Sequence, residues 1–312
     1  MTLQCVLKNA DIRCKRINAQ KGTLNGHPTK IPPNLCQQSV TPGGNTGAFF
    51  IAPRSGICET TLSFSPKVSG QAHQMHSYII HLRGDTQRQP NVQTLMATLP
   101  NAEIVNAVRG RDVIAQNTHL TRPGNLYTPH YPFPLGAGEV GCFLSHRACW
   151  QKIIDSGDDY ALIAEDDLAI DPGIWPDVMH LIQTHATPDL FIRLPAKTRE
   201  KPAQVVAQSG SAKLFVPRVI GLQTVCQVVG RTAAQRLLSA SKTLDRPVDT
   251  FVQMHWATGQ MVHTILPNGV TERTQELGGS TIQKKTRASG KMAREFRRLW
   301  YRSRVKMRPQ SS

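Results

Sequence analysis

The sequence predicts an α/β fold in which a mostly parallel sheet carries helices on both faces. Two observations support this prediction. From residue 75 onward, short apolar runs that suit buried strands alternate with longer segments of helical periodicity. The links between these segments are short, as expected when each helix leads back to a neighbouring strand. At 312 residues, the chain is long enough for one large domain or two modest ones.

The expected strands and helices follow one another in a regular order. A strand over 77–82 comes first, and a helix over 90–99 and a strand over 102–108 follow it. Residues 139–155 form a long helix that is apolar around most of its circumference, which predicts burial. The remaining expected elements are a strand over 160–164, a helix from about Pro172, strands over 190–194, 213–216 and 225–229, and a helix over 232–241.

Residues 1–74 differ in composition from the rest of the chain. They are rich in Gly, Pro, Asn, Gln, Thr and Ser and lack a sustained strand or helix period, so we expect disorder. The run over 48–52 is the one strand-like fragment. Met75 stands two residues before the first expected strand, which suggests that native translation starts there and that the preceding segment is an upstream extension. We therefore expect a domain over 75–283, followed by a tail over 284–312.

The net charge of +16 is concentrated at the two ends of the chain. Residues 1–74 hold 8 Lys or Arg against 2 Asp or Glu, and residues 284–312 hold 11 against 1, whereas the middle holds 18 of each. A nucleic-acid-binding domain would carry its basic stripe on the folded body. The electroneutral middle therefore argues against a nucleic-acid partner.

The last segment has the pattern of a basic amphipathic helix. Along one helical stripe of this segment lie Met292, Phe296, Leu299, Trp300 and Ser303, with arginines elsewhere. Such a helix, with Trp and Tyr at its boundary, suits an anionic membrane surface. The alternative is a solvated charged tail.

The cysteines and the hydropathy indicate a cellular location. The seven cysteines show no Cys or His spacing typical of zinc. Cys142 and Cys149 share one face of the long expected helix and are most simply small core residues. No apolar run of about 18 residues occurs, so no transmembrane helix is expected. We expect a reduced cytoplasmic protein, held at the inner face of the cytoplasmic membrane by its basic tail.

Three consecutive carboxylates, Glu165, Asp166 and Asp167, follow the strand expected over 160–164. Open sheets bind ligands at the edge where such strands end. Adjacent acids repel one another unless a cation or solvent neutralises them. Hard oxygen ligands suit Mg²⁺ or Mn²⁺ carrying a phosphorylated substrate. The alternative is a solvated loop whose acids lie near a helix start.

Four stretches of the chain together resemble one known family. They are the opening strand and turn over 79–88, GEVGCFLSH over 138–146, LIAEDD over 162–167 and RPVD over 246–249. Through them, residues 75 to about 281 are similar to glycosyltransferase family 25, the lipopolysaccharide or lipooligosaccharide galactosyltransferases and their relatives. Position 81 departs from the family pattern, because it carries His in place of the usual Asn.

The resemblance implies a GT-A-like fold and the inverting transfer of a hexose, with galactose from UDP-galactose as the expected donor, to the saccharide of a surface glycolipid. In that family the acidic motif holds a divalent cation, Mn²⁺ or Mg²⁺, which stabilises the charge of the leaving diphosphate. On this basis Glu165 and Asp167 are the expected metal ligands. Asp166 is expected in the catalytic group, turned toward sugar hydroxyls or a helix N-terminus. Which two of the three acids bind metal stays open.

Three residues of the GEVGCFLSH stretch are expected to contact substrate, and each has a structural alternative. His146 is assigned to substrate or phosphate by its place in the motif, although a single helical His is commonly a core residue. Ser145 is assigned with it, and it lacks the His and Asp partners of a hydrolase nucleophile. Glu139 opens the long helix, where an acid interacts well with the helix dipole.

The base and the donor contacts come from the other two stretches. Asp249 follows a proline turn, and the resemblance makes it the candidate base for the acceptor hydroxyl. Its alternative role is to cap the helix that begins next to it. Arg83 and Arg88 follow the first strand and are expected to contact uridine or diphosphate, with ordinary surface arginines as the alternative.

Two other classes of function fit part of the pattern. A peripheral membrane-binding scaffold would use the acidic cluster only to hold a cation. A nucleic-acid-binding protein would use the basic ends, and the neutral middle of the chain argues against it. Release of UDP in the presence of Mn²⁺ would separate the enzyme from the scaffold.

Overall fold

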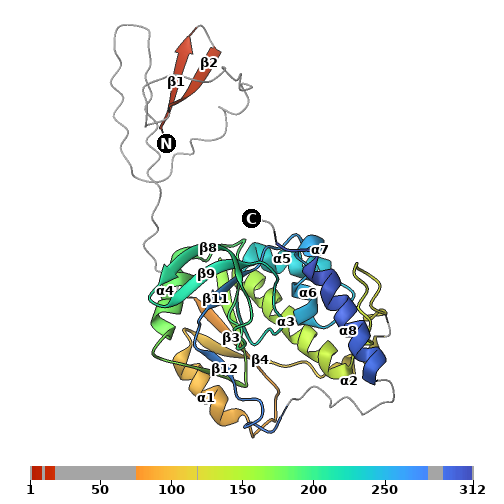
Figure 1. Ribbon diagram of the computed structural model, residues 1–312. Coiled ribbons are helices and arrows are strands. Elements are labelled where there is room, and N and C mark those ends of the chain that lie inside the picture. Colours follow the sequence, from red (N-terminus) through yellow and green to blue (C-terminus); the bar gives the residue numbers. More distant parts are fainter. Residues whose placement is uncertain (1, 9–10, 18–74, 118, 280–290, 311–312) are drawn as a thin grey trace. The chain divides into compact units, whose positions relative to one another are not determined.

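The computed structural model describes residues 2–8, 11–17, 75–117, 119–279 and 291–310 (Figure 1). The chain divides into two units, Met1–Gln71 and Ala72–Ser312. In the first unit, β1 (Thr2–Lys8) and β2 (Asp11–Ile17) pair as an antiparallel hairpin.

This hairpin lies where we expected no regular element. Ile12, Arg13, Cys14 and Lys15 alternate between apolar and basic residues, which is a strand period that the overall polar composition masks. The fragment over 48–52 lies outside the described residues.

The second unit is built on an eight-stranded sheet with the order β4-β3-β5-β10-β7-β11-β9-β8. Its strands are β3 (His76–His81), β4 (Ala102–Asn106), β5 (Tyr160–Glu165), β7 (Phe191–Arg193), β8 (Pro202–Ser209), β9 (Ala212–Pro217), β10 (Cys226–Gly230) and β11 (His263–Leu266). β3 runs parallel to β4 and β5, and β7 runs parallel to β11. β10 and β9 run antiparallel to their neighbours. The predicted mostly parallel α/β sheet is confirmed.

The helices predicted over 90–99, 139–155 and 232–241 are confirmed to within two residues, and other, shorter helices lie where none was predicted. The helices of this unit are α1 (Gln89–Thr98), α2 (Gly110–Gln116), α3 (Ala137–Ser156), α4 (Trp175–His185), α5 (Arg231–Ala240), α6 (Val248–Val252), α7 (His255–Thr258) and α8 (Lys291–Lys306). The helix expected from Pro172 begins at Trp175, because Asp171 first accepts a side-chain hydrogen bond from Gly173 N in a tight turn. β6 (Leu168–Ile170) follows the acidic triplet directly in the sequence and pairs with β12 (Val270–Glu272) in a small antiparallel sheet.

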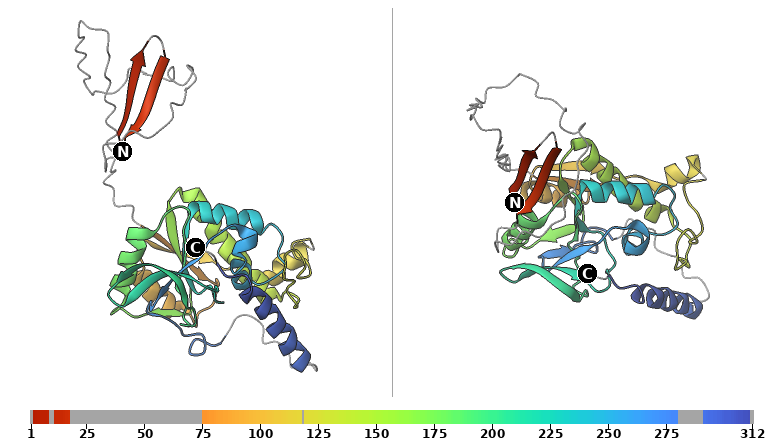
Figure 2. Two further views of the ribbon diagram at one scale, coloured as in Figure 1. Left: turned by 45° about the horizontal axis from the view of Figure 1, so that its top comes forward. Right: turned by 90° about the horizontal axis from the view of Figure 1, so that it is seen from above.

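Alternation along β5 creates two cores, one on each face of the sheet. Ala161 and Ile163 pack with α3, α5 and α6, whereas Leu162 and Ala164 pack with α1 and α4. All four side chains are fully buried, as expected for a strand covered on both faces. The views in Figures 1 and 2 show the sheet lying between these two helical layers.

The ends of β3 and β5 meet at one edge of the sheet. The strands are parallel, and Ile80 of β3 lies opposite Glu165 of β5. The acidic triplet therefore lies beside the segment that leads from β3 into α1. The first turns of α3 also reach this edge, because Gly141 lets the backbone of Val108 approach more closely than a Cβ would allow.

The second half of α8 packs on the domain instead of forming a separate tail. Tyr301 and Val305 are buried, and the Tyr301 hydroxyl accepts a hydrogen bond from buried Arg246. Beyond the helix, Gln310 is buried and bonds to both backbone polar groups of Val262. The stripe that we assigned to the membrane lies exposed beside this docked face.

No helix in the described part of the chain is both long and apolar enough to cross a membrane.

Candidate active site

Two cavities meet at the end of β5. The larger, of about 500 Å³, lies between the ends of β3 and β5, the loop before α2 and the first turns of α3. The smaller, of about 280 Å³, is lined by residues of α3, the loop before β10 and the start of α6. Cys142 and Glu165 line both cavities, so Glu165 lies at the junction between them.

Asp166, the middle acid, is fully engaged by the protein. Its Oδ1 lies 2.5 Å from Arg88 Nη1, and its Oδ2 lies 2.7 Å from His81 Nδ1. Asn91 Nδ2 donates to its carbonyl oxygen at 2.8 Å. The side chains of Asp166 and Arg88 are less than a tenth exposed, so this is a buried ion pair.

Asp167 has one oxygen that the protein satisfies and one that it does not. Oδ2 accepts from Thr274 Oγ1 at 2.9 Å and lies 3.3 Å from Arg88 Nη2. Oδ1 is buried without a partner. Burial, together with the nearby charge of Glu165, raises the pKa of Asp167 above its usual value. An unpartnered buried oxygen beside a second carboxylate fits a divalent cation, which would satisfy the oxygen and offset the repulsion.

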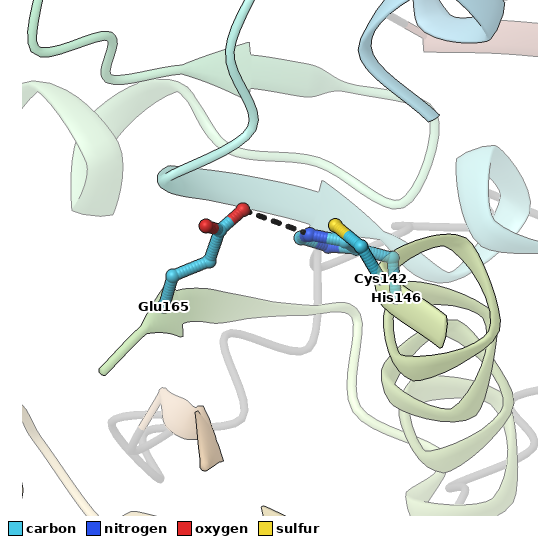
Figure 3. A group of neighbouring side chains, drawn as sticks. All are labelled: Cys142, His146 and Glu165. Atoms are coloured by element: carbon cyan, nitrogen blue, oxygen red, sulfur yellow. Dashed lines mark hydrogen bonds and ion pairs between the residues drawn. The ribbon is translucent and has the colours of Figure 1, made fainter. Parts of the chain in front are cut away.

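The surroundings of Glu165 favour the charged form of its carboxyl group. Its Oε1 accepts a hydrogen bond from Thr224 Oγ1 at 3.1 Å. It accepts a second from His146 Nε2 at 3.2 Å, which Figure 3 shows as a dashed line. Burial alone would raise the pKa of Glu165, but these bonds and the charge of Arg88 outweigh it and leave the pKa lowered. Because Asp166 is committed to Arg88, Glu165 and Asp167 are the two acids left for a cation. Their role as metal ligands stays a prediction.

His146 and Ser145 serve different purposes on α3. His146 is fully buried, with Nδ1 2.8 Å from Gln227 Nε2 and Nε2 directed at Glu165. Ser145 Oγ donates to Gly141 O at 2.8 Å and accepts from Val108 N at 2.9 Å. Ser145 therefore ties the cavity loop to the helix. Both residues line the larger cavity, and their contact with substrate stays a prediction.

The two arginines after β3 have different environments. Arg88 is buried, pairs with Asp166 and Asp167, and also donates to Gly279 O at 2.9 Å. Arg88 thus neutralises the charges of Asp166 and Asp167, a role that we had not expected. It still lines the larger cavity. Arg83 is exposed and does not line either cavity, which agrees with the alternative of a surface arginine.

Asp249 and Glu139 both line the smaller cavity. α6 begins at Val248 with Pro247 as its N-cap, so Asp249 is not the capping residue. Asp249 Oδ1 accepts from Thr250 N at 2.7 Å, and burial raises the pKa of its carboxyl group. Glu139 Oε2 accepts from Gly136 N at 2.8 Å, which is the acidic half of a capping box at the start of α3, since Gly136 has no side chain to form the other half. Glu139 therefore has a structural contact at the start of α3, and a substrate contact stays a prediction.

Sequence reasoning missed several residues that shape the site. His81, Thr224, Gln227 and Thr274 all bond to the acids or to His146. The one available signal was His81, which stands where the family pattern usually has Asn. Cys142, assigned to the core, packs against the core and also lines both cavities, one helical turn before His146.

One family of known proteins matches most of the second unit. The family described as "Glycosyltransferase family 25 (LPS biosynthesis protein)" matches residues 74–252. Similar proteins include procollagen galactosyltransferase 1 of Danio rerio, 28% identical over 202 residues, which are 61% of this chain and 33% of that protein. Procollagen galactosyltransferase 2 of Homo sapiens is 28% identical over 209 residues, which are 61% and 32% of the two chains.

One similar protein is named as probably inactive. The probable inactive glycosyltransferase 25 family member 3 of Rattus norvegicus is 29% identical over 185 residues, 56% of this chain and 32% of its own. The chain thus spans about a third of the length of these relatives. Since the family match covers more than half of the chain, this protein belongs to glycosyltransferase family 25.

Proposed function

We propose that the protein transfers a hexose, with galactose from UDP-galactose as the first donor to test, onto the saccharide of a lipopolysaccharide or lipooligosaccharide. The observation that carries this proposal is the pair of cavities that meet at Glu165. A transferase needs adjoining places for donor and acceptor, and both must reach the same reacting carbon. The galactosyl donor is supported by the names of the two procollagen galactosyltransferases.

The larger cavity suits the nucleotide-sugar donor. Glu165 and Asp167 line one side of it, whereas Arg109 and Arg111 line another and are exposed. Arginine side chains suit diphosphate oxygens, which they can bind in pairs. Glu165 and Asp167 would hold a divalent cation, Mn²⁺ or Mg²⁺, which when bound stabilises negative charge on the leaving diphosphate.

The smaller cavity suits the acceptor. Tyr131 contributes an aromatic ring to its wall, and Asp249 contributes a carboxylate. In an inverting transfer, a carboxylate accepts the proton of the attacking hydroxyl while the bond to the diphosphate breaks. Burial raises the pKa of Asp249, which makes its carboxylate a stronger base than an exposed one.

We expect wild-type protein with Mn²⁺ to release UDP from one UDP-hexose in a donor screen, and Asp167→Asn to lower that turnover about 100-fold or more. The loss should come from the weakened cation site. The measurement is nucleotide release at saturating Mn²⁺, with thermal unfolding as a check on the fold. Asp155→Asn, an exposed acid at the other end of α3, is the matched control.

Two results would contradict this assignment. Near-normal turnover of Asp167→Asn would remove Asp167 from the cation site. No release from any donor by well-folded protein would favour the second candidate, a non-catalytic cation-binding scaffold. This second candidate is retained because the similar rat protein is named as a probable inactive member of the family.

The proposed base should set the pH dependence of transfer. The pKa of Asp249 is raised, so its carboxylate is lost as the pH falls through a value above that of an ordinary aspartate. We expect kcat/KM to be constant at higher pH and to fall on the acid side. Asp249→Asn should lower kcat by about 10²- to 10⁴-fold and remove this acid limb from the residual activity. Donor binding should be unchanged, and an unaltered acid limb in Asp249→Asn would exclude Asp249 as the base.

The exposed face of α8 supports a place at an anionic membrane, on the inner face of the cytoplasmic membrane. Met292, Phe296 and Leu299 are each more than half exposed, although the same helix buries Tyr301 and Val305. Basic residues surround this apolar strip, with 7 Lys or Arg and 1 acid between residues 291 and 306. Apolar insertion flanked by arginines is how interfacial helices bind anionic lipid.

The docked side of α8 lies close to the proposed acceptor cavity. The Tyr301 ring packs edge-to-face on Tyr131, with ring centroids 5.5 Å apart. Tyr131 itself lines the smaller cavity. A membrane that holds α8 would therefore present a lipid-linked saccharide near this cavity.

Tyr301 and Gln310 are buried, so truncating the chain before α8 would damage the domain. The test therefore substitutes exposed residues of α8 instead. Phe296→Ser combined with Trp300→Ser should weaken sedimentation with phosphatidylglycerol vesicles about tenfold or more, since apolar insertion is lost. Transfer to a short soluble acceptor should be unchanged. Lys242→Gln, at an exposed position outside α8, is the control. Vesicle binding by the double variant that equals wild type would show that this face is solvated.

A further inference from the structure

Three side chains with different donor atoms converge at the junction of the two cavities. They are Cys142 and His146 from α3 and Glu165 from the end of β5 (Figure 3). We infer that these residues form a site for a thiophilic divalent cation of the zinc type. This site shares Glu165 with the hard-cation site at Glu165 and Asp167 but takes Cys142 and His146 as its other ligands. Only its consequence for turnover rests on the proposed function.

The spacing of the donor atoms suits such an ion. Cys142 and His146 are four residues apart on α3, so their side chains lie one above the other on the same helical face. One ligand atom from each of the three residues lies within 4.8 Å of the others, and His146 Nε2 is 3.2 Å from Glu165 Oε1. Ligands at zinc distances of about 2.0–2.3 Å around a tetrahedron are separated by roughly 3.3–3.8 Å.

The chemistry of the set favours zinc over magnesium or calcium. A thiolate, an imidazole nitrogen and a carboxylate oxygen are the three ligand types that Zn²⁺ takes in proteins. Mg²⁺ and Ca²⁺ prefer all-oxygen surroundings, so they would select Asp167 over Cys142. Three protein ligands beside open cavities leave a fourth position for water or a substrate oxygen, and binding displaces the thiol proton to solvent.

Gln227 provides a second, independent indication. His146 Nδ1 faces the amide of Gln227, and Gln227 Oε1 is buried without a hydrogen-bond partner. Rotating this amide by half a turn would let Oε1 accept from Nδ1–H, which fixes the tautomer with a lone pair on Nε2. The amide nitrogen would then take the unpartnered place. The hydrogen bond that His146 Nε2 donates to Glu165 in the structure would be replaced by coordination of both atoms to the ion. Metal-binding histidines commonly have such an acceptor on their other ring nitrogen.

Occupation of this site has a consequence for the proposed reaction. Glu165 belongs to both sites, so a zinc-type ion bound to Cys142 and His146 would withdraw Glu165 from the hard cation that carries the donor. Zn²⁺ should therefore inhibit Mn²⁺-dependent transfer.

The test uses the full chain with Cys5, Cys14, Cys36 and Cys58 replaced by Ser, so that thiols outside the site in the first 74 residues cannot bind the probe. Co²⁺ is added without nucleotide or acceptor. We expect a thiolate-to-cobalt charge-transfer band in the near ultraviolet and intense visible bands of a tetrahedral ion, both displaced by Zn²⁺. Cys142→Ser should remove the charge-transfer band. Cys149→Ser, a buried cysteine of the same helix that is not in the set, should retain it.

Two further variants guard against misfolding as an explanation. Gln227→Leu should weaken Zn²⁺ affinity about 10- to 100-fold while leaving the three ligands in place. Cys142→Ser is small and lies at the cavity surface, and its melting temperature should stay near that of the parent. A cobalt spectrum without a thiolate band, or a band that survives Cys142→Ser, would overturn the inference. Because no substrate is present, this outcome is independent of whether the protein transfers hexose.

Discussion

The site depends on one buried guanidinium. Arg88 lies between Asp166 and Asp167 and is 5% exposed, so its charge is neutralised inside the protein. It ties the start of α1 to the end of β5 and also reaches Gly279. Removing one partner of such a pair typically costs about 3–5 kcal/mol, because the other charge stays buried. Without Arg88, three adjacent carboxylates would repel one another at this edge.

Because Arg88 and His81 engage Asp166, the three acids of the triplet have different roles. Asp166 anchors structure, Asp167 keeps one unpartnered oxygen, and Glu165 is held charged by His146 and Thr224. α3 supplies His146 and Cys142 from one face, while its opposite side is packed in the core. A single helix thus supports the strand end and lines both cavities, which explains why the GEVGCFLSH stretch combines glycine, apolar and polar residues.

Local patterns in the sequence predicted the central strands, because β5 is apolar on both faces and the acids follow it directly. They also predicted α3, whose burial shows in its composition. Pairing between distant residues could not be predicted from local patterns. Arg88 and Asp166 are 78 residues apart, and the sequence around neither residue indicates their contact. Short elements such as α7 and β11 were missed because four residues give no periodicity. The exposed stripe of α8 was recognised, whereas the docking of Tyr301 depends on Arg246 and Tyr131 in the folded domain.

The division of roles among the three acids is tested most directly by a crystal structure of the full chain with Mn²⁺ and UDP, using the anomalous signal of manganese. The charge arrangement predicts a manganese peak within bonding distance of Glu165 and Asp167, with Asp166 still paired to Arg88 and His81. A manganese ion bound by Asp166, with Arg88 displaced from it, would contradict this division.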